Sequence, residues 1–222
     1  MVIKKGLVIS KKFLGHNNPY HLEKPERIKA IFEYIKDSGL LEQFEIIEPR
    51  KAKKEEILLC HSEEHFDFVY NKCKSAPDML DGDTFVVYDS FDTALYAAGG
   101  VLEAVDCVFS KKIDRIFCCV RPPGHHATKD HSMGFCIFNN VAIGASYAME
   151  KFKLKKILII DFDLHHGNGT QEIFYNTDRV FYLSIHQYPY YPGTGSKEET
   201  GEGKGKGFTL NVPLPAGTEE KI

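Results

Sequence analysis

The chain has 222 residues, of which 43% are hydrophobic, and its formal net charge is −3 at pH 7. This length and composition suffice for one sizeable core, so we expect a single domain over residues 1–222. The small negative charge argues against a protein that binds nucleic acid by neutralising phosphates. No apolar run approaches the roughly 18 residues of a membrane span, and no apolar signal segment follows Met1, so the expected location is the cytoplasm.

Apolar periodicity and turn residues predict an alternation of strands and helices. The first helix has Pro25 in its first turn and Gly39 just beyond its end, where each residue favours a helix boundary. From residue 113 onward the alternation is typical of a parallel sheet with crossover helices, so the fold class is α/β. In chain order, the expected strands cover 2–9, 45–48, 113–120, 156–163, 180–187 and 206–214, the expected helices cover 25–38, 55–60, 62–73, 90–108, 139–152 and 169–175, and the polar segment 78–84 is expected to be a loop.

Three other features are interpreted as ordinary structure. The six cysteines form no C-x-x-C pair and mostly lie in apolar stretches, so we expect reduced, buried thiols. Glycines gather between Gly193 and Gly207, but a strand follows them where a phosphate loop would need a helix, which favours a surface loop. The run from Lys151 to Lys156 is expected to be a solvated helix end.

Two polar clusters follow predicted strands. Asp161, Asp163 and His165 continue the apolar run 156–160, and side chains two apart on a strand share one face. The run Arg121-Pro-Pro-Gly-His-His-Ala127 follows the strand 113–120 and contributes two more imidazoles. Because open parallel sheets place their sites at the carboxyl ends of strands, we expect both clusters at one edge of the sheet. Six of the ten histidines belong to these and neighbouring strand exits, at positions 125, 126, 131, 165, 166 and 186.

The combination favours a metal site with acid/base partners. A lone aspartate at a strand end is commonly a cap or an ion-pair partner, and a lone histidine is more often structural than a ligand. Both interpretations lose force when carboxylates and imidazoles alternate beside a His-His pair. Carboxylate oxygen and imidazole nitrogen suit zinc, and manganese or ferrous iron accept the same ligands.

The two clusters belong to a larger set of motifs that spans nearly the whole chain. In chain order the other members are His21-Leu-Glu-Lys-Pro-Glu-Arg27, Gly134-Phe-Cys-Ile-Phe-Asn-Asn-Val-Ala142, Asp161 to Gln171, Ser184-Ile-His-Gln187, Tyr191-Pro-Gly-Thr-Gly195 and Asn211-Val-Pro-Leu-Pro215. This set resembles the zinc-dependent histone deacetylase superfamily, which includes class II deacetylases, bacterial acetylpolyamine amidohydrolases and acetoin-utilisation proteins. The resemblance implies a three-layer, arginase-like α/β fold with a central, mostly parallel sheet flanked by helices.

The resemblance also implies an activity, the hydrolysis of an acetyl amide by zinc-activated water. Asp163 and His165 match two zinc ligands, and His125 and His126 match the tandem catalytic histidines. In the family pattern the carboxylate of Asp161 fixes the tautomer of His125, while His126 accepts the proton of the water and helps to protonate the leaving amine. The substrate is expected to be acetyl-lysine or an acetylated polyamine, a choice that the sequence leaves open.

By the same resemblance, Phe135 and Tyr191 match the aromatic walls of the acetyl-lysine channel, and Gly134 leaves room for the substrate stem. The alternative is that both rings are ordinary core residues. Asp83 corresponds to the carboxylate at the channel rim that holds the substrate backbone. Asn168 replaces the second carboxylate of many class I members, which indicates a class II-like or bacterial enzyme and a less cationic His126.

Potassium is a further implied ligand. One set combines the main chain of Asp161, Asp163 and His165 with Ser184. A second set lies near Phe174, Thr177 and Val180.

The chain departs from the family pattern at its C-terminal end. The third zinc ligand and the oxyanion-stabilising tyrosine of the family have no counterpart up to residue 222, and residues 218–222 are typical of the start of a helix. We therefore expect an incomplete domain, with its C-terminal strands and helices absent, that binds zinc weakly and turns over little, because catalytic zinc usually takes three protein ligands.

Two alternatives to a deacetylase stay open. One is a binuclear manganese ureohydrolase, which the tandem His125-His126 pair fits poorly. The other is a non-catalytic, deacetylase-like regulator, which the C-terminal departure favours and the intact site residues disfavour. A homo-oligomer and a complementing C-terminal segment are both compatible with the sequence.

Overall fold

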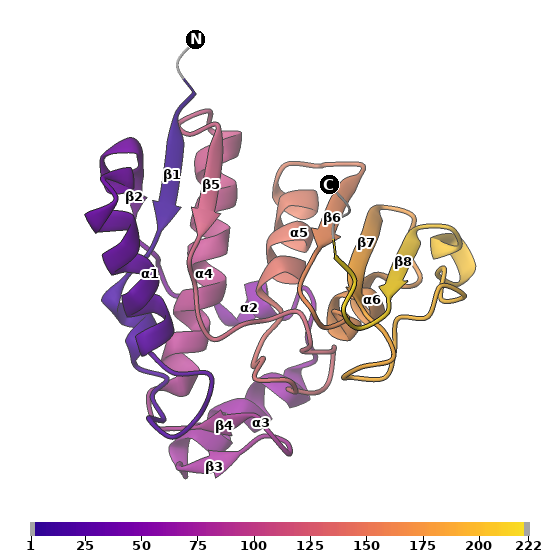
Figure 1. Cartoon of the computed structure of the whole chain (residues 1–222), viewed down its shortest axis with the longest axis horizontal. Helices are drawn as coiled ribbons and strands as arrows, with labels where there is room; N and C mark the ends of the chain where they lie inside the picture. The colour runs from indigo at the N-terminus through magenta and orange to yellow at the C-terminus, as the bar shows by residue number, and fades with distance from the viewer. Residues whose placement is uncertain (1–2, 220–222) are drawn as a thin grey trace.

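Two separate parallel sheets form the framework of the computed structural model, which describes residues 3–219 (Figure 1). In the first sheet β1 (Lys5–Val8) lies between β2 (Glu45–Ile47) and β5 (Arg115–Cys118). In the second, β7 lies between β6 and β8. The second sheet comprises β6 (Ile157–Asp161), β7 (Val180–Gln187) and β8 (Thr209–Leu214).

The expectation of one continuous sheet therefore needs correction. Within residues 3–219, β5 pairs only with β1 and β6 pairs only with β7, so the facing edges of these two strands carry no partner. All strand pairs in both sheets are parallel, as the alternating order of elements predicted. Sequence periodicity defines strands but not which edges meet, and for that reason the gap was not foreseen.

Helices cover the sheets and join the two halves. The first helix behaves as predicted, since Pro25 occupies its N-cap position and Gly39 follows its end with a φ of 70°. Ser62 and Asn139 cap later helices by accepting hydrogen bonds from the backbone amides of His65 and Ala142. The helices are α1 (Glu26–Asp37), α2 (Lys54–Ile57), α3 (Glu63–Lys74), α4 (Ser90–Phe109), α5 (Asn140–Lys151) and α6 (Asn168–Phe174), with short 3₁₀ turns η1 (Lys11–Leu14), η2 (Leu40–Gln43) and η3 (Gly203–Gly205).

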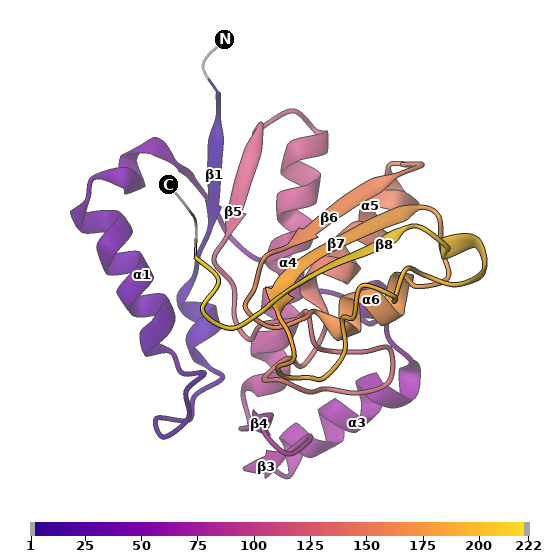
Figure 2. The same cartoon turned by 45° about the vertical axis from the view of Figure 1, so that its right-hand side comes forward.

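The long helix α4 links two hydrophobic clusters. Leu102 packs in the larger cluster, with α5 and the second sheet, whereas Ala104 packs with the first sheet. Figure 2 shows β6, β7 and β8 side by side, with α5 and α6 on one side of them. The opposite face of this sheet is uncovered, because the side chains of Leu158 and Ile160 are 58% and 52% exposed.

Three local expectations also need correction. The predicted loop 78–84 leads into a small antiparallel hairpin of β3 (Asp78–Met79) and β4 (Phe85–Val86). Strand β6 ends at Asp161, so Asp163 and His165 lie on the loop that follows it. The glycine-rich segment 193–207 is not a plain surface loop, because several of its glycines are buried.

Other expectations are confirmed or untested. All six cysteines are free, as predicted, and four of them are buried. Of the predicted N-terminal strand, residue 2 lies outside the described residues, as does most of the expected helix start at 218–222. Among residues 3–219, no helix is long and apolar enough to cross a membrane.

Candidate active site

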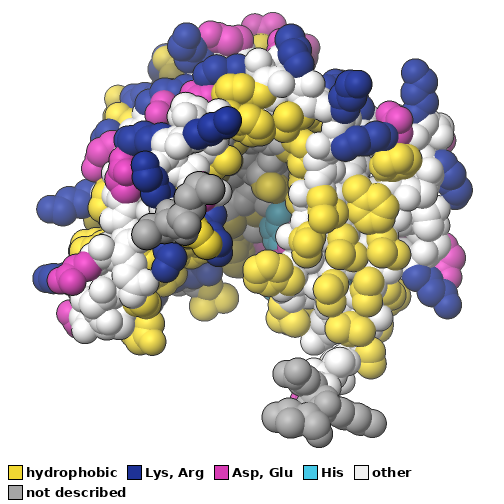
Figure 3. Space-filling view, turned by 90° about the horizontal axis from the view of Figure 1, so that it is seen from above, with side chains coloured by type: hydrophobic (Ala, Val, Ile, Leu, Met, Phe, Trp, Pro, Cys, Tyr) yellow, Lys and Arg dark blue, Asp and Glu magenta, His cyan; other side chains and the backbone are white. Residues whose placement is uncertain are grey.

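The two predicted clusters meet in one pocket at the carboxyl ends of β5 and β6. Figure 3 shows histidine side chains inside the hollow between the two halves of the molecule. The pocket has a volume of about 420 Å³. Eight residues expected at the site line it, namely Asp83, His125, His126, Gly134, Phe135, Asp163, His165 and Tyr191.

His125 is held by a buried carboxylate. Its Nδ1 donates a hydrogen bond of 3.0 Å to Asp161 Oδ2, and the hydroxyl of Tyr182 donates to the same oxygen at 3.0 Å. Burial opposes the charged form of His125, but the hydrogen bond and charge of Asp161 outweigh burial and raise the pKa of His125. The same pairing lowers the pKa of Asp161 despite its own burial. The carboxylate of Asp161 therefore stabilises the protonated form of His125 relative to a free imidazole.

His126 has the opposite electrostatic character. Its Nδ1 lies 2.8 Å from Asn168 Oδ1, and because an amide oxygen only accepts, Nδ1 carries the hydrogen. Burial, and then the charge of neighbouring His125, lowers the pKa of His126 to about 4. His126 is thus a neutral imidazole near pH 7, and its Nε2 is the nitrogen that can accept a proton.

Asp163 supplies an oxygen donor and His165 a nitrogen donor, and the two atoms lie close together. Asp163 Oδ1 lies 3.1 Å from His165 Nδ1 and also accepts the backbone amide of His165 at 2.8 Å, which fixes the carboxylate. Two donors bound at about 2.0–2.1 Å to a tetrahedral zinc would lie roughly 3.3 Å apart, so this pair fits the ion. Within residues 3–219, however, no three His, Cys, Asp or Glu side chains form a group that could hold a metal.

One wall of the pocket is a left-handed turn. Gly134 and Phe135 have φ values of 57° and 69°. The amide of Gly134 donates to Asp83 Oδ1 at 3.1 Å, and the amide of Phe135 donates to Thr84 Oγ1 at 3.1 Å. A Cβ atom at position 134 would collide with the ring of His126, so this glycine permits close approach of the wall to the histidine.

The other wall is aromatic. The ring of Tyr191 meets that of His126 edge-on, with centroids 5.1 Å apart, and that of His165 at 5.8 Å. Tyr190, which the sequence analysis did not single out, stacks on His165 at 5.3 Å. Tyr191 and Phe135 are both partly exposed at the pocket, which disfavours the interpretation of these rings as plain core residues.

The residues expected to bind potassium lie in two places. Asp161 and Ser184 are register partners on β6 and β7, and Ser184 is buried with its hydroxyl 2.9 Å from His186 Nδ1. Phe174 ends α6, and its carbonyl already accepts the amide of Thr177 at 3.2 Å. Val180 begins β7.

Three predicted histidines do not join the pocket. His166 and His186 lie together behind it, with ring centroids 4.8 Å apart. His131 lines a different groove. Proximity to a strand exit in the sequence therefore does not by itself place a side chain in the site.

The structure adds residues that the sequence analysis missed. Arg27, on the first turns of α1, and Leu22 line the pocket from the N-terminal loop. His21 donates from Nε2 to the carbonyl of Asp83 at 3.1 Å and meets Phe135 edge-on at 4.7 Å, so it supports that wall. The motif from His21 to Arg27 was a signal for these contacts, whereas nothing local marked Tyr182.

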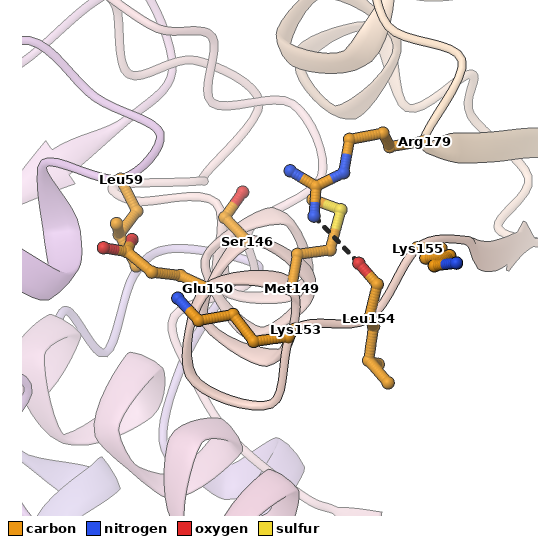
Figure 4. A pocket seen from close by; sticks show the side chains of 8 residues that line it. All are labelled: Leu59, Ser146, Met149, Glu150, Lys153, Leu154, Lys155 and Arg179. Carbon is orange, nitrogen blue, oxygen red and sulfur yellow. Dashed lines mark hydrogen bonds between the residues drawn. The ribbon is translucent and has the colours of Figure 1, made fainter.

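A separate hollow of about 640 Å³ lies beside Lys153, Lys155 and Arg179. In Figure 4, Arg179 points to the carbonyl of Leu154, to which it donates a hydrogen bond of 2.8 Å, while the two lysines extend in different directions. These cations do not converge on a common point, which agrees with the interpretation of this region as a solvated helix end.

Comparisons with known proteins bear on the whole chain. Residues 21–222 match the sequence family described as the histone deacetylase domain. A probable deacetylase of Archaeoglobus fulgidus is 42% identical over 219 residues, which are 97% of this chain and 60% of that protein. Histone deacetylase HDA1 of Saccharomyces cerevisiae is 37% identical over 222 residues, covering 89% of this chain and 31% of that protein.

A solved structure has a similar fold. The crystal structure of the HDA15 HD domain superposes with a TM-score of 0.93 at 35% sequence identity. The superposition covers 97% of this chain and 64% of that one. The chain thus spans less than two thirds of the length of these relatives.

Proposed function

Because the chain belongs to the histone deacetylase family, we propose that it provides most of a zinc-dependent site that hydrolyses an acetyl amide. The observation that supports this most directly is the neutral His126 beside the Asp163–His165 donor pair in one pocket. The expected products are acetate and a free amine, from acetyl-lysine or an acetylated polyamine.

Asp163 and His165 would hold the zinc, and ferrous iron or manganese would suit the same donors. When bound, the ion supplies Lewis acidity toward the acetyl carbonyl and the attacking water. The described residues provide two donors, so we propose that a complementing C-terminal segment provides the rest. The unpaired edges of β5 and β6 beside the pocket are consistent with such a segment.

The two histidines have different roles, proton transfer for His126 and charge stabilisation for His125. His126 Nε2 takes a proton from water as the water oxygen bonds to the acetyl carbon. The carbon–nitrogen bond then breaks, and the same proton passes to the nitrogen of the leaving amine, so that one water is consumed for each acetate formed. His125, whose protonated form Asp161 stabilises, would stabilise the negative charge that develops on the carbonyl oxygen.

The walls position the substrate. The rings of Phe135 and Tyr191 would pack against the aliphatic chain that carries the acetyl group, and Asp83 would accept hydrogen bonds from the substrate at the rim. We also propose potassium near Asp161 and Ser184 as a structural ion.

Zinc binding tests the proposal without requiring turnover. Titration calorimetry should show one zinc site that Asp163→Asn weakens at least about tenfold, since it replaces a charged ligand with a neutral one. Asp37→Asn, at an exposed position on α1, is the matched control and should bind zinc like the wild type. Equal zinc affinity in the wild type and Asp163→Asn would show that the metal site has been misplaced.

A further inference from the structure

A buried polar network lies behind the loop that carries Tyr191. Its two histidines, His166 and His186, are 0% and 2% exposed. His166 Nδ1 lies 2.8 Å from the hydroxyl oxygen of Thr194, and His186 Nε2 donates to the carbonyl of Gly195 at 2.9 Å. A Cβ atom at position 195 would collide with both imidazoles, so the backbone of the loop lies directly against them. The two histidines thus attach the loop just beyond Tyr191.

A carboxylate holds the same stretch of backbone. Glu199 Oε1 accepts the amides of Gly195 and Ser196, each at 2.9 Å. Its other oxygen accepts a hydrogen bond from the side-chain amide of Gln171, on α6, the helix whose first residue contacts His126. Burial opposes ionisation of Glu199, but the hydrogen bonds that it accepts outweigh burial and lower its pKa. The carboxylate is therefore ionised near pH 7 and acts only as an acceptor.

The direction of each hydrogen bond follows from this carboxylate. Gln171 must donate to Glu199 through Nε2, which makes its Oε1 the acceptor. That oxygen receives Nδ2 of Asn211 at 2.7 Å and Nε2 of His166 at 3.0 Å. With its hydrogen on Nε2, His166 accepts at Nδ1, so the hydroxyl of Thr194 is the donor. From Glu199 to Thr194 the donors and acceptors match, and matched buried networks of this kind are rigid.

The loop held in this way carries two aromatic rings, Tyr190 and Tyr191, which together form the tyrosine wall. Tyr190 stacks on His165 with ring centroids 5.3 Å apart, and Tyr191 meets His126 edge-on at 5.1 Å. His166 directly follows His165 in the chain, so the network joins the segment with the expected metal donors to the segment with the wall. Its hydrogen bonds therefore span the two sides whose separation sets the width of the pocket.

We propose that Glu199 and Gln171 are positioning residues, which hold the tyrosine wall against the histidines of the pocket. Both lie behind the wall and not among the residues that line the pocket, so they act through the loop. The inference rests on the proposed function where it concerns the substrate, because the wall is expected to pack against the aliphatic chain. Loss of the network should displace the wall and weaken substrate binding.

An exchange of the two side chains tests this pairing. Glu199→Gln places two amide groups opposite each other, and Gln171→Glu places two carboxylates opposite each other. The double variant Glu199→Gln/Gln171→Glu can form every hydrogen bond of the pair again, with the charge on the other residue. Glu198→Gln, which alters an exposed carboxylate in the same loop, is the matched control.

Nuclear magnetic resonance of protein labelled at its histidine rings measures the position of the wall without zinc or turnover. The ring resonances of His165 and His126 depend on the distance to the neighbouring tyrosine, and Tyr190→Leu and Tyr191→Leu give their values without each ring. Both single variants of the pair should move these resonances toward those values, and the double variant should return them toward the wild type. The control should leave them unchanged.

Unchanged histidine resonances in both single variants, with only a lower melting temperature, would overturn the proposal, because the pair would then affect stability alone. If either single variant does not fold, substitutions at Thr194, an exposed residue, give the same test. Thr194→Val removes the hydroxyl that His166 accepts and should move the His126 resonance, whereas Thr194→Ser keeps the hydroxyl and should not. Identical spectra for Thr194→Val and the wild type would likewise overturn the proposal.

Kinetics of acetate release by the full-length gene product test the effect on the substrate. Glu199→Gln should raise KM for an acetyl-lysine peptide at least about threefold and change kcat by less than about twofold, because the wall contacts substrate and transition state alike. A lower kcat at unchanged KM would contradict a role in substrate binding. The histidine resonances require neither zinc nor hydrolysis, so failure of the positioning role and failure of the proposed function remain distinguishable.

Discussion

At the scale of single residues, the pKa of each histidine in the site depends on its surroundings, above all on burial and on its hydrogen-bond partner. The carboxylate of Asp161 raises the pKa of His125, whereas burial and the charge of His125 lower the pKa of His126, whose Nδ1 has only an amide oxygen as partner. Two titratable groups whose surroundings separate their pKa values are suited to different roles, one electrostatic and one as a base. Asn168 gives His126 an amide oxygen as its partner in place of a carboxylate, and this contact could be predicted from the sequence only through the family resemblance.

His16, a histidine outside the pocket, affects the free energy of unfolding. His16 is buried against Glu23 and Arg121, which form an ion pair, and its Nδ1 lies 2.7 Å from Ser90 Oγ. Burial, followed by the charge of Arg121, lowers the pKa of His16 to about 3. The unfolded chain, with an ordinary histidine pKa near 6.5, therefore binds a proton that the folded chain does not between about pH 6.5 and 3.

Because the unfolded chain binds more protons, the free energy of unfolding decreases as the pH falls from about 6.5 to 3. His16 alone should contribute a slope approaching 1.4 kcal/mol per pH unit to the free energy of unfolding. Urea denaturation at pH 7, 6 and 5 should show a shallower slope for His16→Gln than for the wild type. An unchanged slope would mean that His16 is already protonated in the folded protein.

At the scale of elements, the turn at Gly134–Phe135 has two separate requirements for glycine. Gly134 has a φ of 57°, which residues with a side chain rarely adopt. A Cβ atom at position 134 would also collide with the ring of His126. Gly39 has a similar φ of 70°, but no atom lies within 4 Å of the position that a methyl group would take there. Comparing alanine substitutions at Gly39 and Gly134 therefore separates the cost of the left-handed backbone from the cost of the collision with His126.

We expect Gly39→Ala to destabilise the fold by about 1 kcal/mol, the cost of the left-handed backbone alone. Gly134→Ala should cost about 1–3 kcal/mol more, because the methyl group and the His126 ring cannot both keep their places. Thermal and urea unfolding of both variants would measure the difference. Equal losses for the two would show that the wall is not packed on His126.

The elements were largely predictable, and their assembly was less so. Strand β7 was predicted with its observed bounds, and side chains that are buried alternate with more exposed ones along it. Strand β6 was predicted too long, since Asp163 continues the alternation but its backbone has already turned away to present the carboxylate. The pairing of Tyr182 with Asp161 depends on register between strands, which local sequence does not encode.

At the scale of the whole molecule, two half-sheets face each other across a hollow with the histidines inside it (Figure 3). Parallel sheets are usually covered on both faces and rarely leave apolar edges free. Here one face of the second sheet and the facing edges of β5 and β6 are bare within residues 3–219, and the relatives are longer than this chain.

For the whole molecule, we propose that His126 is the base of a zinc-dependent acetyl-amide hydrolase. The most direct measurement is acetate release from an acetyl-lysine peptide and from an acetylated polyamine, with zinc supplied, by the product of the gene read to its stop codon. The wild type should release acetate, and His126→Ala should lower kcat by about 10²–10⁴ while it binds zinc normally, because it loses only the proton acceptor. Acetate release by His126→Ala at the wild-type rate would contradict the account.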